Sequence, residues 1–197
     1  PIDAPHGVYM SETSSNGMMA AMVYGQSIAC GDNGDDNTTD NTWWRVYKPS
    51  DYGVNDTFHV TEVDVSVQET STTPTITVNV GTYAGTIDAA TINTAQITNL
   101  ATAQAPAPPT SGQTGESLKF PITATIPAGA QFIVSVAAPN QDITGTTDQY
   151  FYIGATSAAD THRAYLSSTG CGITTPELVS TVSGTAGYMI IDVQGTN

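Results

Sequence analysis

The strongest constraint on this chain is a repeated alternation of apolar and polar side chains with a period of two residues. Residues 75–80 read TITVNV, which places Ile76, Val78 and Val80 in one phase and polar residues in the other. Successive side chains of a β-strand point to opposite faces, so this segment predicts a strand with one buried face. Strand patterns also occur at 43–48, 58–68, 118–126, 132–138, 149–155 and 187–195.

These segments predict an all-β fold. Threonine, which favours strands, accounts for 32 of the 197 residues, and no window keeps the apolar spacing of a helix over a dozen residues. We expect a single jelly-roll-like β-sandwich of about eight or nine strands with long loops. The buried phase changes at Thr61–Glu62, which predicts a β-bulge, and Pro121 predicts an edge strand or a bulge.

The charge balance excludes two classes of partner. The chain has 18 acidic and 4 basic residues, for a net charge of −14. So few basic side chains cannot neutralise a nucleic-acid backbone, and the negative surface disfavours anionic lipid. No apolar run reaches the length of a membrane span, so we expect no membrane insertion.

Two cysteines, Cys30 and Cys171, bear on the compartment. In a lysine-poor, threonine-rich chain they fit an oxidising setting, so the protein is predicted to be extracellular or on the cell surface. Each cysteine has only the other as a partner, and the alternative is two buried free thiols.

An acidic loop is the best candidate for a metal site. Asp32, Asp35, Asp36 and Asp40 lie within nine residues and alternate with asparagines. Carboxylate and amide oxygens are what Ca²⁺ prefers, so a structural Ca²⁺ ion is predicted here. The spacing differs from that of an EF-hand, and a solvated loop with Asx turns is the alternative.

Adjacent aromatic residues raise the possibility of a sugar site. Trp43 and Trp44 point to opposite faces of one strand, so one of them, with Tyr47, could present a ring for stacking on a polysaccharide. The alternative places one tryptophan in the core and the other beneath a loop or a neighbouring subunit.

Catalytic motifs are missing from the sequence. It contains no G-x-S-x-G motif, and the three histidines, His6, His59 and His162, do not have zinc-ligand spacing. We therefore expect no enzymatic activity.

The chain divides into two regions. Residues 1–26 hold four of the five methionines and no basic residue. They are interpreted as an N-terminal arm, which either packs on its own domain or pairs with a neighbouring molecule. Residues 27–197 form the predicted β-sandwich domain.

Several motifs within 27–197 resemble a Cys-bridged β-sandwich accessory module of secreted bacterial proteins. They are a cysteine loop rich in Asp and Asn, the strand WWRVY, the hairpin IPAGAQFIVSV and the ending FYIGATS…AYLSSTGCGITTP. The resemblance implies an extracellular sandwich, the pairing of the two cysteines and no catalytic residues. The segment 1–26 departs from that module, and so does our expectation that the domain stands alone, without an attached enzyme.

Two functions follow as hypotheses. The first is a non-catalytic extracellular structural subunit that assembles with copies of itself into a filament, tube or surface layer by exchange of a β-strand or arm. The alternative is a carbohydrate-binding or adhesion module of a secreted protein.

Overall fold

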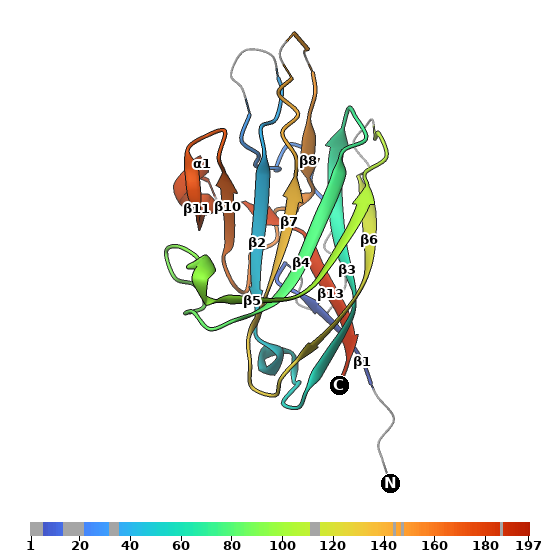
Figure 1. Cartoon of the computed structure of the whole chain (residues 1–197), viewed down its shortest axis with the longest axis vertical. Helices are drawn as coiled ribbons and strands as arrows, with labels where there is room; N and C mark the ends of the chain where they lie inside the picture. The colour runs from blue at the N-terminus through green and yellow to red at the C-terminus, as the bar shows by residue number, and fades with distance from the viewer. Residues whose placement is uncertain are drawn as a thin grey trace.

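Two antiparallel sheets stacked face to face make up this protein (Figure 1). The computed structural model describes residues 6–13, 22–31, 36–110, 115–143, 145–146, 148–185 and 187–197. The predicted all-β sandwich is confirmed. In the described residues it has thirteen strands rather than eight or nine, because strands of two or three residues and an additional long strand at 97–106 escaped the sequence pattern.

The first sheet has five strands. Its order is β1 (Gly7–Ser11), β13 (Ile191–Thr196), β3 (Phe58–Thr70) and β6 (Glu116–Ile126), and β8 (Phe151–Ile153) also pairs with β3.

The second sheet has six strands. Its order is β11 (Ile173–Leu178), β10 (Ala164–Ser168), β2 (Asn41–Tyr47), β7 (Phe132–Ala138), β4 (Thr75–Tyr83) and β5 (Ile97–Pro106). A separate pair joins β9 (Ala155–Thr156) to β12 (Tyr188–Met189), and the short helical turns are η1 (Pro49–Tyr52), η2 (Thr94–Gln96) and α1 (Val179–Ser183).

The core lies between the two sheets and follows the predicted alternation. Ile76, Val78 and Val80 of β4 are fully buried. The register of β3 shifts between Val60 and Glu62 against β6, which confirms the predicted bulge. Pro121 lies in β6, the last strand of its sheet, opposite Glu62 at the bulge of β3, where an edge strand tolerates a proline.

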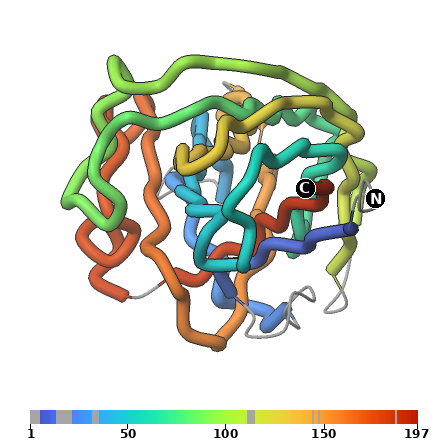
Figure 2. Tube along the Cα trace, turned by 90° about the horizontal axis from the view of Figure 1, so that it is seen from below, coloured from blue at the N-terminus to red at the C-terminus, as the bar shows by residue number. Residues whose placement is uncertain are grey.

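Within the predicted arm 1–26, the described residues follow the alternative in which the segment packs on its own domain, and residues 1–5 and 14–21 lie outside the described residues. Residues 7–11 form β1, which pairs antiparallel with β13 of the same chain from Gly7 opposite Thr196 to Ser11 opposite Asp192. Figure 2 shows β1 (blue) beside β13 (red). Met10 is fully buried in the core, so the sandwich includes residues that the sequence assigned to the arm.

The only α-helix in the described part of the chain has five residues. No helix there has the length and hydrophobicity needed to cross a membrane.

Candidate ligand-binding site

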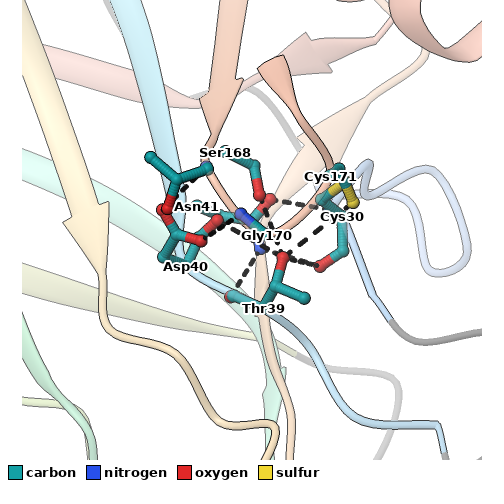
Figure 3. Close-up of a disulfide and its surroundings, with 8 residues drawn as sticks. Cys30, Thr39, Asp40, Asn41, Ser168, Gly170 and Cys171 are labelled. Carbon is teal, nitrogen blue, oxygen red and sulfur yellow. Dashed lines mark hydrogen bonds between the residues drawn. A yellow bond between two sulfur atoms is a disulfide. The ribbon is translucent and has the colours of Figure 1, made fainter. Parts of the chain in front are cut away.

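A disulfide joins Cys30 to Cys171, with their Cα atoms 6.2 Å apart. It links the segment that precedes β2 to the turn between β10 and β11 (Figure 3). The side chain of Asn41 holds the backbone at Cys30, because its Oδ1 accepts from Cys30 N at 2.7 Å and its Nδ2 donates to Cys30 O at 2.9 Å. The bridge therefore closes onto a segment already fixed by β2.

Asp40, predicted as a calcium ligand, anchors this same turn (Figure 3). Its carboxylate accepts from Thr169 N at 2.9 Å, Thr169 Oγ1 at 2.7 Å and Gly170 N at 2.8 Å. Partial burial opposes ionisation, but these donors lower the pKa of Asp40 below its ordinary value. Donors of the protein therefore contact both carboxylate oxygens of Asp40, and its role as a calcium ligand stays a prediction.

The other three predicted calcium ligands lie elsewhere. Asp36 is exposed and has a left-handed backbone, with φ of 54°. Asp32 and Asp35 lie outside the described residues. No group of three or more His, Cys, Asp or Glu side chains suited to a metal occurs within the described ranges. Calcium binding by this loop therefore stays a prediction.

The three predicted sugar-binding aromatics separate into two buried rings and one that reaches the surface. Trp43 and Tyr47 are fully buried, so neither can stack on a ligand, which corrects that part of the prediction. Trp43 Nε1 donates to Ile28 O at 2.7 Å, and Tyr47 donates to Ile191 O. Trp44 lies on the opposite face of β2 and is only partly buried. Its Nε1 donates to Ser167 Oγ at 3.1 Å, which fixes the indole.

Trp44 lines an open pocket of about 250 Å³ on the outer face of the six-stranded sheet, which we call the Trp44 pocket. Its lining is an aromatic ring, two aliphatic side chains and a group of amides and hydroxyls. The residues are Trp44, Asn79, Gly81, Thr94, Ile97, Asn99, Ile133 and Ser135.

The polar groups of the pocket are held in position by neighbouring strands. Asn79 Nδ2 donates to Ser135 Oγ at 3.2 Å, and Asn79 Oδ1 accepts from Thr102 Oγ1 at 2.7 Å. The side-chain amide of Asn79 therefore still has one Nδ2 proton and one Oδ1 lone pair to offer a ligand. Among the described residues, no basic and no acidic side chain lines the pocket, so its chemistry is that of neutral hydrogen bonding beside a ring.

The long connection between β4 and β5 covers part of the outer face of the six-stranded sheet. Ile92 N donates to Pro176 O at 2.9 Å, and Tyr165 donates to Ala89 O at 2.9 Å, so residues 84–96 lie across β10 and β11. The pocket lies where this cover ends. Gly81 lines it, and a Cβ there would lie 2.7 Å from Thr98 O, so only glycine permits the close approach of β5.

A larger pocket of about 430 Å³ lies at the start of β10, with Asp88, Asp160, His162 and Arg163 among its lining residues. Beneath it Arg45 of β2 is fully buried. Its Nη2 contacts Asp160 Oδ1 at 2.8 Å, and its Nη1 donates to His162 O at 2.9 Å. Because Arg45 is always charged, Asp160 provides the charge that balances it.

Two more carboxyl groups are buried near Arg45. Glu12 and Asp192 are each at most 1% exposed. Burial raises the pKa of Glu12 to about 7, although His162 and Arg45 lower it. Burial also raises the pKa of Asp192 and of Asp160, against the effect of Arg45. We call Glu12, Arg45, Asp160, His162 and Asp192 the buried charge cluster.

His162 is held between two carboxylates. Its Nδ1 lies 2.9 Å from Asp88 Oδ2, and its Nε2 lies 2.9 Å from Asp51 Oδ2. Partial burial works against protonation, but Asp51 and Asp88 raise the pKa of His162. Both ring nitrogens are therefore engaged, which leaves no lone pair to activate a nucleophile.

Sequence reasoning missed the polar half of the Trp44 pocket and the whole buried charge cluster. Asn79 was placed on the outward face, but the sequence does not indicate which outward residues lie beside Trp44. Arg45 was part of a predicted strand, and an isolated arginine between apolar neighbours is the one signal that could have marked it as buried.

The fold defines an antiparallel β-sandwich with one disulfide and an open pocket on an outer sheet face. Among the solved structures that match it is a Cys-to-Ala variant of the clostridial cysteine protease Cwp84 after propeptide cleavage, with a TM-score of 0.53 and 12% sequence identity. The match covers 82% of this chain and 37% of that one, so the chain spans little more than a third of that protein's length. The likeness concerns the fold. No family model and no curated protein matches the sequence.

Proposed function

We propose that this protein is a non-catalytic, extracellular module that binds a neutral polysaccharide in the Trp44 pocket. The observation that carries the proposal is the indole of Trp44, fixed at the surface beside oriented amides and hydroxyls. A sugar ring offers an apolar face for stacking and hydroxyls for hydrogen bonds, which are the two kinds of contact that the pocket provides.

The size and charge of the pocket define the ligand further. A volume of about 250 Å³ is below the usual range for a site that engulfs a drug-sized ligand, so the pocket suits one sugar residue of an exposed chain. A net charge of −14 repels acidic glycans, and no basic side chain lines the pocket to offset it. The ligand is therefore an uncharged glycan.

Two observations support the remaining parts of the proposal. The Cys30–Cys171 disulfide fits an oxidising compartment, either outside the cell or at its surface. The engagement of both nitrogens of His162 by Asp51 and Asp88 supports a role without catalysis, since the histidine has no free base to offer.

Self-assembly into a filament, tube or surface layer stays a prediction. It receives no support from β1, because this strand already fills the edge of its own sheet. Sedimentation velocity at high protein concentration separates the two functions, since a binding module sediments as a monomer and a polymer subunit does not.

Affinity electrophoresis tests the binding proposal. The protein is run in gels that contain hydroxyethyl cellulose, xylan, glucomannan or soluble starch, with alginate as the acidic control. We expect retardation in at least one neutral gel and none in alginate. Trp44→Ala should weaken binding at least tenfold, or about 1.4 kcal/mol, because the stacking surface is lost.

The matched control is Tyr152→Ala, which removes a partly buried aromatic ring from β8 in the other sheet. It should leave the retardation unchanged. Equal mobility of Trp44→Ala and the wild type in the retarding gel contradicts the proposal, and so does free migration of the wild type in every neutral gel.

A further inference from the structure

The N-terminal strand, β1, lies at one edge of its sheet. β1 is the last strand of its sheet and pairs only with β13, so its release breaks one ladder and leaves the rest intact. Met10 is its fully buried core residue. Beyond β1 the chain is held by Tyr52, which donates to Ser11 O at 2.9 Å, and by Thr161 N, which donates to Glu12 O at 2.8 Å.

Glu12 is the side chain that closes this attachment. Its Oε2 accepts from His162 N at 3.0 Å, while its Oε1 is buried and has no hydrogen-bond partner among the described residues. An unpartnered oxygen of an ionised carboxylate is costly to bury, whereas a protonated carboxyl group loses much less by burial.

The charges around Glu12 do not compensate for its ionisation. Arg45 of β2 faces it, but this arginine already pairs with Asp160 at 2.8 Å. His162 of the 157–163 loop also faces it, with its ring held by Asp51 and Asp88. A side-chain hydrogen bond with Tyr52 of η1 also lowers the pKa of Glu12, and the Tyr47 hydroxyl of β2 lies near it, but burial outweighs these favourable contacts. Asp192 of β13 is a further buried carboxyl group of the same cluster, and it also has an oxygen without a partner.

We propose that residues 7–13 form an acid-held latch, which docks most firmly on the sandwich at acidic pH and loosens as the pH rises to neutrality. The geometry that carries it is an edge strand whose last anchor is a buried carboxyl group, near a buried arginine that already has a partner. Release of the latch exposes the backbone of β13 to solvent while both sheets stay folded.

The direction and size of the pH effect on docking of residues 7–13 follow from proton linkage. The pKa of Glu12 is 4.5 in its ordinary state and about 7 when docked, so the docked form binds more protons between these values. Docking is therefore strongest below pH 4.5, weakens as the pH rises from 4.5 to 7, and changes little above pH 7. Between pH 5 and pH 8.5 the opening equilibrium of residues 7–13 increases on the order of 50- to 100-fold.

Hydrogen exchange read by mass spectrometry on the full chain tests the latch. Rates at pH 5 and pH 8.5 are divided by the intrinsic exchange rates, and β4 and β7 serve as internal references. We expect protection of residues 7–13 to fall on the order of 50- to 100-fold, with β4 and β7 unchanged. Glu12→Gln, which stays neutral, should reduce that fall at least tenfold. Glu116→Gln, at an exposed carboxylate, should behave like the wild type.

A second measurement uses the wild-type protein alone. Carbon-detected NMR of the glutamate carboxyl groups should show one group, Glu12, that titrates near pH 7. A titration of every glutamate near its ordinary pKa overturns the latch. Equal protection of residues 7–13 at both pH values overturns it too, as does a simultaneous loss in β4 and β7, which indicates unfolding of the whole domain.

Discussion

Replacement of Arg45 by methionine is the most informative single perturbation of this fold. The side chain of Arg45 is fully buried, and methionine retains most of its volume without its charge. The substitution removes the contact with Asp160 at 2.8 Å and the donors to His162 O and Met189 O. Asp160 has only 11% of its side chain exposed, so it remains buried without its partner.

The magnitude follows from these losses. Breaking a buried ion pair by removing one member costs about 3–5 kcal/mol, and each carbonyl oxygen that loses its donor adds on the order of 1 kcal/mol. We therefore expect Arg45→Met to lower the free energy of unfolding by about 5–7 kcal/mol at pH 7. Burial raises the pKa of Asp160, so this carboxyl group becomes neutral in acid. The decrease in the free energy of unfolding caused by Arg45→Met should therefore be smaller at acidic pH.

Urea denaturation followed by tryptophan fluorescence measures the effect. The matched control is Lys119→Met, which removes an ion pair with Glu62 and Asp64 at a side chain that is 57% exposed. An exposed pair of this kind contributes less than about 1 kcal/mol. Adding Asp160→Asn to Arg45→Met should restore part of the lost free energy of unfolding, because the unpaired charge at position 160 is removed. Equal destabilisation by Arg45→Met and Lys119→Met would refute the reasoning, because burial would then make no difference.

Three further predictions concern the disulfide, a glycine and calcium. Replacing both Cys30 and Cys171 by serine should destabilise the domain by up to about 5 kcal/mol in urea denaturation, since the bridge spans 141 residues; an unchanged midpoint contradicts this. Gly195→Ala should lower stability by about 1–3 kcal/mol, because a Cβ would lie 2.3 Å from His59 O, and a wild-type melting temperature would show that β13 shifts without cost. Calcium binding near Asp36 predicts that EDTA lowers the melting temperature and that Asp36→Asn abolishes the difference, whereas identical curves with and without EDTA remove calcium from the account.

Local pattern predicted the strands whose two faces differ most in polarity. The alternation of Ile76, Val78 and Val80 marked β4, and the change of phase at Thr61–Glu62 marked the bulge in β3. The weak pattern of 97–106 hid β5, because its alanines and threonines are too similar in polarity to show which face is covered.

The candidate site depends on tertiary contacts, which the sequence does not encode locally. Nothing near Asn79 in sequence indicates that it lies beside Trp44, because the register between β2, β7 and β4 brings them together. Glu12 stood in a segment without periodicity, and its burial depends on β1 pairing with β13 at the far end of the chain. Such pairings between distant segments are set by the packing of the whole domain.

The most direct test of the binding account is an indole NMR titration with the neutral polysaccharide that retards the protein. The chain has two tryptophans, one buried and one at the pocket, so the two indole N–H signals report the core and the site separately. The account predicts that the Trp44 signal moves with saturation while that of Trp43 stays in place. A titration that leaves the Trp44 signal unmoved while binding occurs would contradict it.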